Sequence, residues 1–201
     1  MSPQFGNYRY LSLTLGLLKP DITNMTYTLH QVRQMILQKG FIVLRSNIIP
    51  KMKRTQAEAF YEEHRDRFFY NRLVTYMSSG SVHAHILALP SNTPNDTNAI
   101  KVWRDLMGPT KVMKTRYTEP NSIRGSFGLT DTRNCSHGSD SLDTAKREIQ
   151  FFFPNFDTFA FSGSLEEKTI LQKYGDNNLK IETICFYSTS WNSNAVIVQK
   201  R

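Results

Sequence analysis

Apolar residues recur along the chain at two spacings, and these spacings predict an alternation of strands and helices. Residues 11–18 read LSLTLGLL and predict a buried strand, which ends at Pro20. Apolar positions then recur at helical spacing from Leu29 to Ile36, and Gly40 supplies a stop. Residues 41–49 are β-branched and apolar, so they predict a second strand.

The middle of the chain continues this alternation. The run TQAE at residues 55–58 resembles a capping box and predicts that a helix opens there; a further helix is expected over 69–77. Ser78 to Gly80 form a turn, and residues 82–89 predict a third strand. Residues 90–97 (PSNTPNDT) predict a polar loop, followed by a helix over 99–106.

The next part of the chain predicts a loop, a short strand and a last helix. Residues 108–126 lack clean periodicity and carry several basic residues, which indicates a long functional loop. A short strand is expected around 134–137, and Asp140 or Ser141 caps a helix that runs to about residue 152. This order of elements is that of an α+β fold with a ferredoxin-like antiparallel sheet covered by helices.

The composition changes at about residue 158, where Gly, Asn and Ser become frequent and only 180–187 looks strand-like. We therefore predict one domain over residues 1–157 and a C-terminal extension over 158–201. The hydrophobic share of 39% excludes a disordered chain. No apolar run approaches the ~18 residues of a membrane-spanning helix.

The formal net charge of +8 suits an anionic partner, such as nucleic acid, a membrane surface or a free nucleotide. Cys135 and Cys185 lack metal-type spacing and are too few for a disulfide framework, so we interpret both as reduced thiols in an intracellular protein. The first residues carry no secretory signal. They support a mitochondrial presequence only weakly, which leaves cytoplasmic and mitochondrial locations open.

The segment RNCSHGSDS at residues 133–141 carries the main candidate for chemistry, His137. A neutral imidazole offers one ring nitrogen as a nucleophile, while the other is fixed by a hydrogen bond, often to a carboxylate. Glu148 lies on the following predicted helix and could supply that carboxylate. A single histidine beside a helix is more often structural, so His137 alone decides nothing.

A series of motifs spans roughly residues 11–153: Lys19-Pro20-Asp21, Tyr61, Phe69, Arg104, Thr110, Ile123-Arg124-Gly125, and the run from Arg133 to Ser141 around His137. In this order the series resembles the nucleoside diphosphate kinase family. The sequences of three segments are most similar to the divergent branch called type six: SIRGSFGLTDTRN, RFFYNRLVTYMSSG and WRDLMGPT.

The resemblance implies a ping-pong phosphotransferase in which His137 takes the terminal phosphate of a nucleoside triphosphate and passes it to a nucleoside diphosphate. Residues 1–157 would form the catalytic domain. Mg²⁺ would be carried by the nucleotide, with no metal ligands of the protein's own. The implied catalytic residues are His137, Lys19, Tyr61, Ser139 and Glu148. The implied nucleotide-binding residues are Lys19, Phe69, Leu73, Arg104, Thr110, Arg124 and Asn134.

Three departures from the family pattern stand out. The loop between Thr110 and Arg124 is a few residues longer than in common members, where it helps to build hexamers. Asp131-Thr132 replaces the usual apolar-Gly pair beside the base. The 158–201 extension has no counterpart in short members. A homo-oligomer is therefore possible, and the sequence predicts no number of subunits.

Two other classes of function stay open at the sequence level. One is a nucleotide-binding interaction protein that has low activity of its own and needs a protein partner. The other is a nucleic-acid-binding ferredoxin-like module, although Arg124-Gly125-Ser126-Phe127 places Ser where the RNA-recognition motif requires an aromatic residue. We therefore do not expect nucleic acid as the partner. His83 and His85 alternate on one strand face as a weak metal candidate without a third ligand.

Overall fold

Four antiparallel strands form one sheet in the order β2-β3-β1-β4. The structure is a computed structural model that describes residues 10–91 and 98–156. The strands are β1 (Tyr10–Leu18), β2 (Ile42–Ile49), β3 (Val82–Ser91) and β4 (Ser136–Gly138). This strand order confirms the prediction of a ferredoxin-like α+β fold. Strands β1 and β3 are neighbours at the centre of the sheet, and helices lie in the connections between strands.

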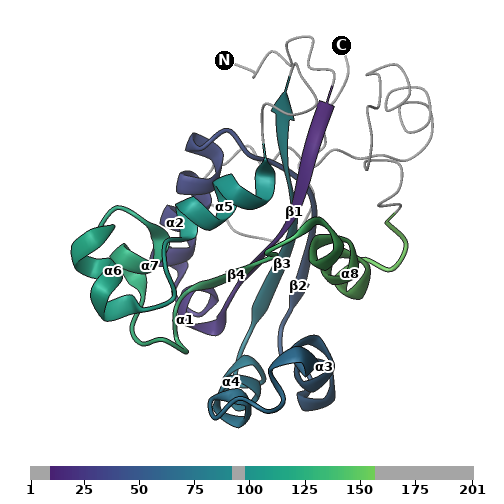
Figure 1. Ribbon diagram of the computed structural model, residues 1–201, viewed down its shortest axis with the longest axis vertical. Helices are drawn as coiled ribbons and strands as arrows, with labels where there is room; N and C mark the ends of the chain where they lie inside the picture. The colour runs from purple at the N-terminus through teal and green to yellow at the C-terminus, as the bar shows by residue number, and fades with distance from the viewer. Residues whose placement is uncertain (1–9, 92–97, 157–201) are drawn as a thin grey trace.

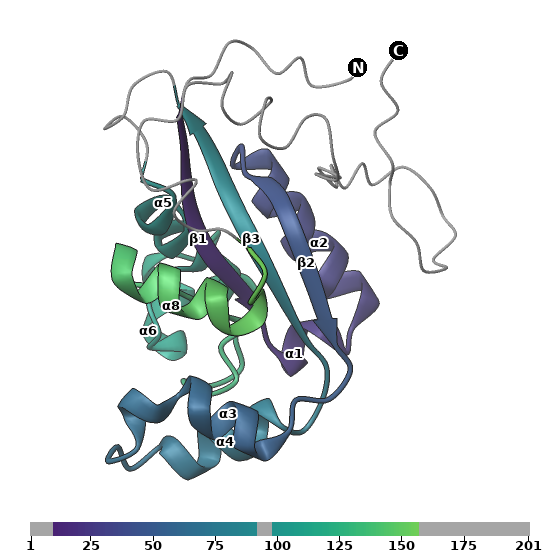
Figure 2. The same ribbon diagram turned by 90° about the vertical axis from the view of Figure 1, so that its right-hand side faces the viewer.

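Helices connect and cover these strands. They are α1 (Pro20–Thr23), α2 (Thr26–Gln38), α3 (Arg54–Phe60), the 3₁₀ helix η1 (Glu62–His64), α4 (Tyr70–Met77), α5 (Ala99–Met107), α6 (Val112–Thr118), α7 (Ile123–Phe127) and α8 (Leu142–Phe152). Figure 1 shows α2 and α5 on one side of the sheet and α8 on the other, with α3 and α4 at the lower end. Figure 2 shows β1, β3 and β2 side by side, with α2 behind β2.

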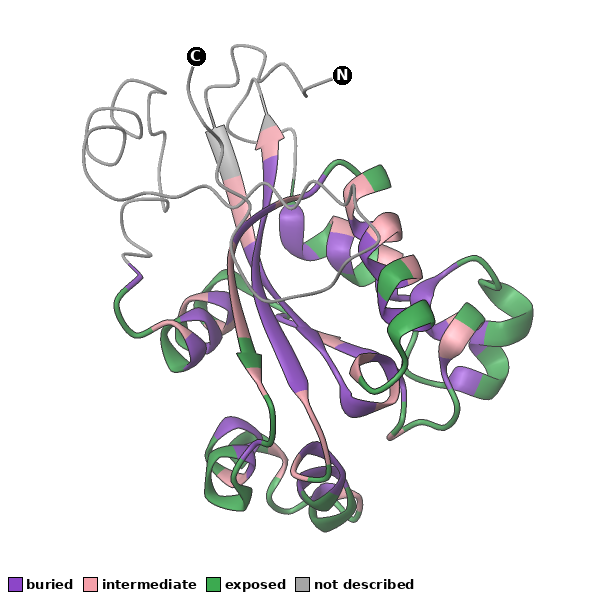
Figure 3. Ribbon diagram, turned by 180° about the vertical axis from the view of Figure 1, so that it is seen from behind, coloured by how far each residue is buried: buried purple, intermediate pink, exposed green. Residues whose placement is uncertain are grey.

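The sheet separates two apolar cores. Leu15 and Leu17 of β1 belong to the core under α3, α4 and α8, whereas the next residue, Leu18, belongs to the core under α2 and α5. Strand β3 divides in the same way, because successive side chains point to opposite faces. Both faces of the central strands are therefore buried (Figure 3), which explains why their sequences are mostly apolar, with small residues or histidines between.

The prediction of a structureless loop over 108–126 was wrong, because this segment contains α6 and α7. Val112 and Thr115 of α6 are buried, and the Ser122 hydroxyl caps α7 by accepting from the backbone N–H of Gly125 at 3.1 Å. Helices of seven and five residues are too short to display a repeated apolar period.

The capping box at 55–58 was also misplaced, because α3 begins at Arg54 with Lys53 as its N-cap residue. The side-chain oxygen of Gln56 accepts from the Lys53 backbone N–H at 3.0 Å, so Gln56, rather than Glu58, completes the capping box. Strand β3 continues to Ser91, slightly beyond the predicted loop boundary. The remaining part of that loop and the 158–201 extension, with its strand-like 180–187, lie outside the described residues.

Candidate functional site

His137 is presented from the middle of β4, opposite Leu17 of β1. The indole N–H of Trp103 on α5 donates to the His137 carbonyl at 3.2 Å. The next residue must be small, because a Cβ at Gly138 would collide with the Trp103 indole. Strand pairing and the indole therefore hold the backbone of His137 at a defined place.

The carboxylate of Glu148 on α8 orients the His137 ring. Its Oε1 lies 2.7 Å from His137 Nε2, and its Oε2 accepts from the Ser139 hydroxyl at 2.6 Å. Glu148 is 2% exposed, so water does not compete for these bonds. Because a carboxylate only accepts, we place the imidazole proton on Nε2, which leaves the lone pair on Nδ1.

Two aromatic rings stand edge-on to the His137 ring, Phe60 at 5.2 Å and Tyr61 at 5.9 Å between centroids. The Tyr61 hydroxyl is buried and has no hydrogen-bond partner among the described residues. Burial, and then the negative charge of Glu148, raises the pKa of Tyr61 well above its usual value. Tyr61 is therefore a neutral phenol with a proton to donate.

Lys19, at the end of β1, contributes a buried cation. Its Nζ donates to Asn134 Oδ1 at 2.7 Å, and Asn134 Nδ2 donates in turn to the Asp131 carbonyl at 3.0 Å. Burial, and then the nearby Arg124 charge, lowers the pKa of Lys19 to about 8. An ammonium has three donors, so Lys19 keeps donors for an anionic ligand.

Arg124 is a buried cation whose donors are mostly used by the protein. Its Nε, Nη1 and Nη2 donate to the carbonyls of Asn134, Gly108 and Ser136 at 3.2, 2.6 and 2.9 Å. Gly108 adopts a positive φ of 77°, a conformation that favours glycine, and thereby turns its carbonyl toward Arg124. Burial lowers the pKa of Arg124 to about 10, so it stays charged at neutral pH.

These groups meet at a cavity of about 420 Å³. Of the residues predicted from sequence, the cavity brings together Lys19, Tyr61, Phe69, Leu73, Thr110, Arg124, Asn134 and His137. The lining combines cations and His137 with the apolar side chains of Phe69 and Leu73. Such a set can bind a ligand that carries both an anion and an apolar ring.

Three predicted residues do not line this cavity. Ser139 and Glu148 lie behind His137 and act on its orientation. Arg104 is an exposed residue of α5, close enough for its charge to lower the pKa of Arg124 and of Asp140. The hydrogen bond from Thr144 is the largest cause of the Asp140 shift.

The sequence reasoning missed several lining residues, of which Arg72 and Lys111 carry charge, and it named Asp131 only as a departure from the family pattern beside the base. Lys111 Nζ lies 3.1 Å from Asp131 Oδ2, and Asp131 Oδ1 accepts from the Val112 backbone N–H at 3.1 Å. Arg72 could have been found from its place one turn after Phe69 on α4, since residues three apart share a helix face.

Asp21 of the Lys19-Pro20-Asp21 motif anchors the loop that carries this site. Its carboxylate accepts from the Tyr76 hydroxyl at 2.5 Å and from the Cys135 backbone N–H at 2.9 Å. Cys135 is the one described non-glycine residue with a positive φ, 71°. The thiol of Cys135 is buried, and burial raises its pKa far above the ordinary value.

The histidine pair on β3 has core partners. His83 Nδ1 lies 3.4 Å from Arg33 Nη2, and His85 Nδ1 lies 2.9 Å from the Ser46 hydroxyl. Burial, and then Arg33, lowers their pKa values to about 4 and about 3. Within residues 10–91 and 98–156, no cluster of three or more His, Cys, Asp or Glu side chains is placed to hold a metal. In the same residues, no helix is long and apolar enough to cross a membrane.

Comparison with known proteins identifies the family of the chain. The family model described as nucleoside diphosphate kinase matches residues 12–158. The chain is similar to nucleoside diphosphate kinase 6 of Homo sapiens, with 49% identity over 146 residues that cover 73% of this chain and 74% of the relative. It is 47% identical to the Xenopus tropicalis protein of the same name over 150 residues, covering 75% and 79%.

Solved structures show the same likeness. The Aquifex aeolicus nucleoside diphosphate kinase has a TM-score of 0.64 and 35% identity, covering 71% of this chain and 95% of that chain. The Halobacterium salinarum nucleoside diphosphate kinase in complex with CDP has a TM-score of 0.60 and 28% identity, covering 74% and 95%. With its ferredoxin-like sheet and its matched residues 12–158, the chain belongs to the nucleoside diphosphate kinase family, in the type-six branch.

Proposed function

We propose that this chain transfers the terminal phosphate of a nucleoside triphosphate to a nucleoside diphosphate through a phosphorylated His137. One observation carries the proposal: Nε2 of His137 is held by Glu148, while the imidazole lines a cavity that also contains Lys19 and Arg124. A nucleophilic nitrogen and fixed cations beside it are the minimum that phosphoryl transfer needs.

In the first half-reaction the Nδ1 lone pair of His137 attacks the terminal phosphorus. The nitrogen–phosphorus bond forms as the bond from phosphorus to the bridging oxygen breaks, and that oxygen leaves with its electron pair as part of the diphosphate. Positive charge on the ring is stabilised by the bond from Nε2–H to Glu148. In the second half-reaction a terminal oxygen of the acceptor diphosphate attacks the same phosphorus, and Nδ1 leaves with its electron pair.

Lys19 supplies the charge-assisted hydrogen bonds to the transferring phosphate, because its ammonium keeps donors beyond the one given to Asn134. Arg124 acts mainly as a fixed positive charge, since three of its donors are bonded to backbone carbonyls. Thr110 adds a hydroxyl at the cavity, and Arg104 lies close enough to add a second guanidinium when a nucleotide is bound.

The apolar part of the cavity takes the base. Phe69 offers a ring face for stacking and Leu73 packs beside it, a mode of contact that every base can use. Asn134 also lines the cavity, and its amide N–H beyond the one given to the Asp131 carbonyl bonds a sugar hydroxyl. The Tyr61 hydroxyl, which has no partner among the described residues, donates a hydrogen bond to the phosphate as charge develops beside His137.

We propose that Mg²⁺ enters with the nucleotide. The described lining of the cavity has one carboxylate, Asp131, and both of its oxygens are bonded to other groups. This donor set fits an ion that keeps its phosphate and water ligands. When bound, the ion neutralises part of the triphosphate charge, and Lys19 and Arg124 supply the remainder.

Exchange of phosphate between ATP and a second nucleoside diphosphate tests the proposal. His137→Ala is expected to lose exchange while the affinity for ADP, measured by calorimetry, is retained. His30→Ala is the matched control, because His30 is an exposed residue of α2 on the other face of the sheet. Exchange at the wild-type rate in His137→Ala would overturn the proposed role.

A further inference from the structure

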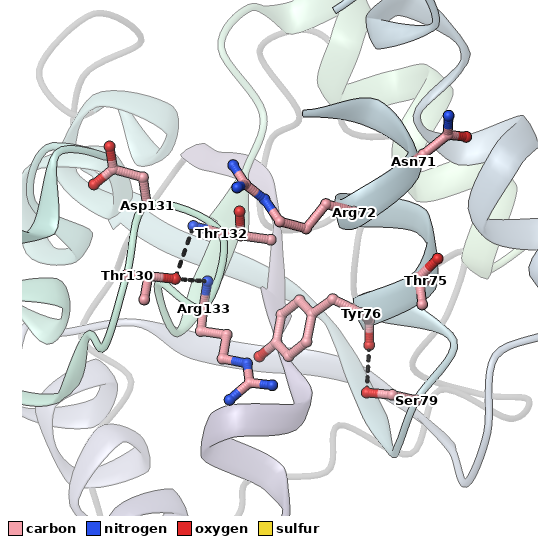
Figure 4. Close-up of a pocket in the computed structure, with 9 residues that line it drawn as sticks. All are labelled: Asn71, Arg72, Thr75, Tyr76, Ser79, Thr130, Asp131, Thr132 and Arg133. Carbon is pink, nitrogen blue, oxygen red and sulfur yellow. Dashed lines mark hydrogen bonds between the residues drawn. The ribbon is translucent and has the colours of Figure 1, made fainter. Parts of the chain in front are cut away.

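Arg72 of α4 lies where two cavities meet. Besides the cavity that contains His137, a second one of about 820 Å³ adjoins it. Arg72, Asp131 and Thr132 line both of them. Figure 4 shows the Arg72 side chain extending from α4 toward the loop of residues 130–133, with Arg133 and Tyr76 below it.

The donors at this junction are available, whereas the acceptors are used. Within residues 10–91 and 98–156, no hydrogen bond or ion pair engages the side chains of Arg72 and Thr132. Both carboxylate oxygens of Asp131 already accept, from the Val112 backbone N–H and from Lys111 Nζ, each at 3.1 Å. The junction therefore presents a free guanidinium fork and a free hydroxyl to a ligand, beside a carboxylate that is already satisfied.

The position of Arg72 relates it to one particular part of a bound nucleotide. Phe69 precedes it by three residues, a spacing that puts two residues on one side of a helix, and both line the cavity that contains His137. A base stacked on Phe69 therefore shares its cavity with Arg72, and Arg72 extends that lining into the second cavity.

The edges of the bases differ in what they offer to a guanidinium. Guanine presents two acceptors, O6 and N7, which match the fork of an arginine in a bidentate contact. Adenine presents N7 beside an amino group that donates, so one arm of the fork meets another donor. Uracil and thymine carry an acceptor at O4, whereas cytosine carries an amino group at that position.

We propose that Arg72 makes this site selective for nucleotides with a carbonyl on the outer edge of the base, with guanine and hypoxanthine preferred over adenine and uracil over cytosine. The Thr132 hydroxyl supports the same choice as a second donor, and Asp131 does not oppose it because its oxygens are occupied. The proposal rests on the proposed function, since it assigns the base end of the same site.

Equilibrium binding of diphosphates by calorimetry, without any triphosphate, tests the proposal apart from phosphate transfer. The wild-type chain is expected to bind GDP and IDP at least about tenfold more tightly than ADP, the lower part of the range for a bidentate base contact. The 7-deaza analogue of GDP, which lacks the N7 acceptor, is expected to lose much of this preference. UDP is expected to bind more tightly than CDP.

Two substitutions at one position sharpen the test. Arg72→Met keeps the length of the side chain without its donors, and the preference is expected to fall to within about twofold. Arg72→Gln places an amide that matches the adenine edge, so the preference is expected to move toward ADP. Arg133→Met is the matched control, because Arg133 lines only the larger of the two cavities. Its guanidinium carbon lies 5.8 Å from the centre of the Tyr76 ring. Its loss is expected to leave the preference unchanged.

The outcomes separate this proposal from the proposed function. Equal binding of GDP and ADP by the wild-type chain, or an unchanged preference in Arg72→Met, overturns the selectivity, while a phosphorylated His137 would still support the kinase reaction. A preference that Arg72→Met removes and Arg133→Met retains supports the selectivity whether or not His137 is phosphorylated.

Discussion

The Lys19 ammonium lies 2.7 Å from the side-chain oxygen of Asn134 and joins the end of β1 to the segment that leads into β4. The two residues are 115 positions apart in the sequence. Lys19 is 5% exposed, so its charge is held where water cannot stabilise it. This arrangement suits a group whose partner is a phosphate, and it places a stability cost on the ligand-free protein.

Lys19→Met is expected to remove that cost. The unfolded chain keeps the lysine proton up to its ordinary pKa of 10.5, whereas the folded chain releases it at about 8. The contribution of Lys19 to the free energy of unfolding therefore rises as the pH goes from about 8 to 10.5. Urea unfolding should show Lys19→Met at least as stable as the wild-type chain at about pH 7, with its advantage shrinking by about pH 10.

Lys39→Met is the control for this comparison, because Lys39 is an exposed residue at the end of α2. It should show no such dependence on pH. An advantage of Lys19→Met that grows as the pH rises would contradict the account. Nucleotide affinity should fall in Lys19→Met at about pH 7, because a donor and a charge to the phosphate are lost.

Glu148→Gln is expected to slow phosphate transfer about 10- to 100-fold, the range found for carboxylates that orient metal-bound imidazoles. The amide can still accept from Nε2–H, yet it lacks the charge that stabilises a positive ring. The loss should appear in the rate of His137 phosphorylation in rapid-quench experiments, with nucleotide affinity retained. Glu63→Gln is the control, since Glu63 makes an exposed ion pair with Arg147.

Tyr61→Phe is expected to separate stability from activity. The Tyr61 hydroxyl is buried without a hydrogen-bond partner among the described residues, and such a group costs about 1–3 kcal/mol. Its removal should raise the midpoint of thermal unfolding and lower the rate of phosphate transfer. Tyr70→Phe should do neither, because the Tyr70 hydroxyl has a long 3.4 Å contact to the Glu58 carbonyl and its other partner, Arg65, is an exposed side chain. A destabilised Tyr61→Phe with full activity would contradict both parts.

The sequence predicts those parts of the fold whose pattern is local and repeated. Strands β1 and β3 are buried on both faces and are mostly apolar, and α8 carries its own cap in the Ser141 hydroxyl, 3.1 Å from the Thr144 backbone nitrogen. Helix α6 has no such local signal. Its first N–H groups include that of Val112, which is bonded by Asp131, a residue 19 positions later.

The candidate site also contains some residues that the sequence predicts and others that it does not. Lys19, Asn134 and His137 stand in motifs that follow one another in the family's order, so a resemblance brings them together before any geometry is known. Arg72 stands outside these motifs, and an arginine on an amphipathic helix is ordinarily a solvated charge. Its spacing from Phe69 is a weak hint, and the two cavities that Arg72 lines mark it as a residue facing a ligand.

The most direct test of the account is the intact mass of the chain after incubation with ATP and Mg²⁺, followed by ADP. The account predicts one acid-labile phosphate that ADP removes, present in the wild-type chain and absent from His137→Ala. A chain that binds nucleotide but gains no phosphate, or a phosphate that remains in His137→Ala, would contradict the account.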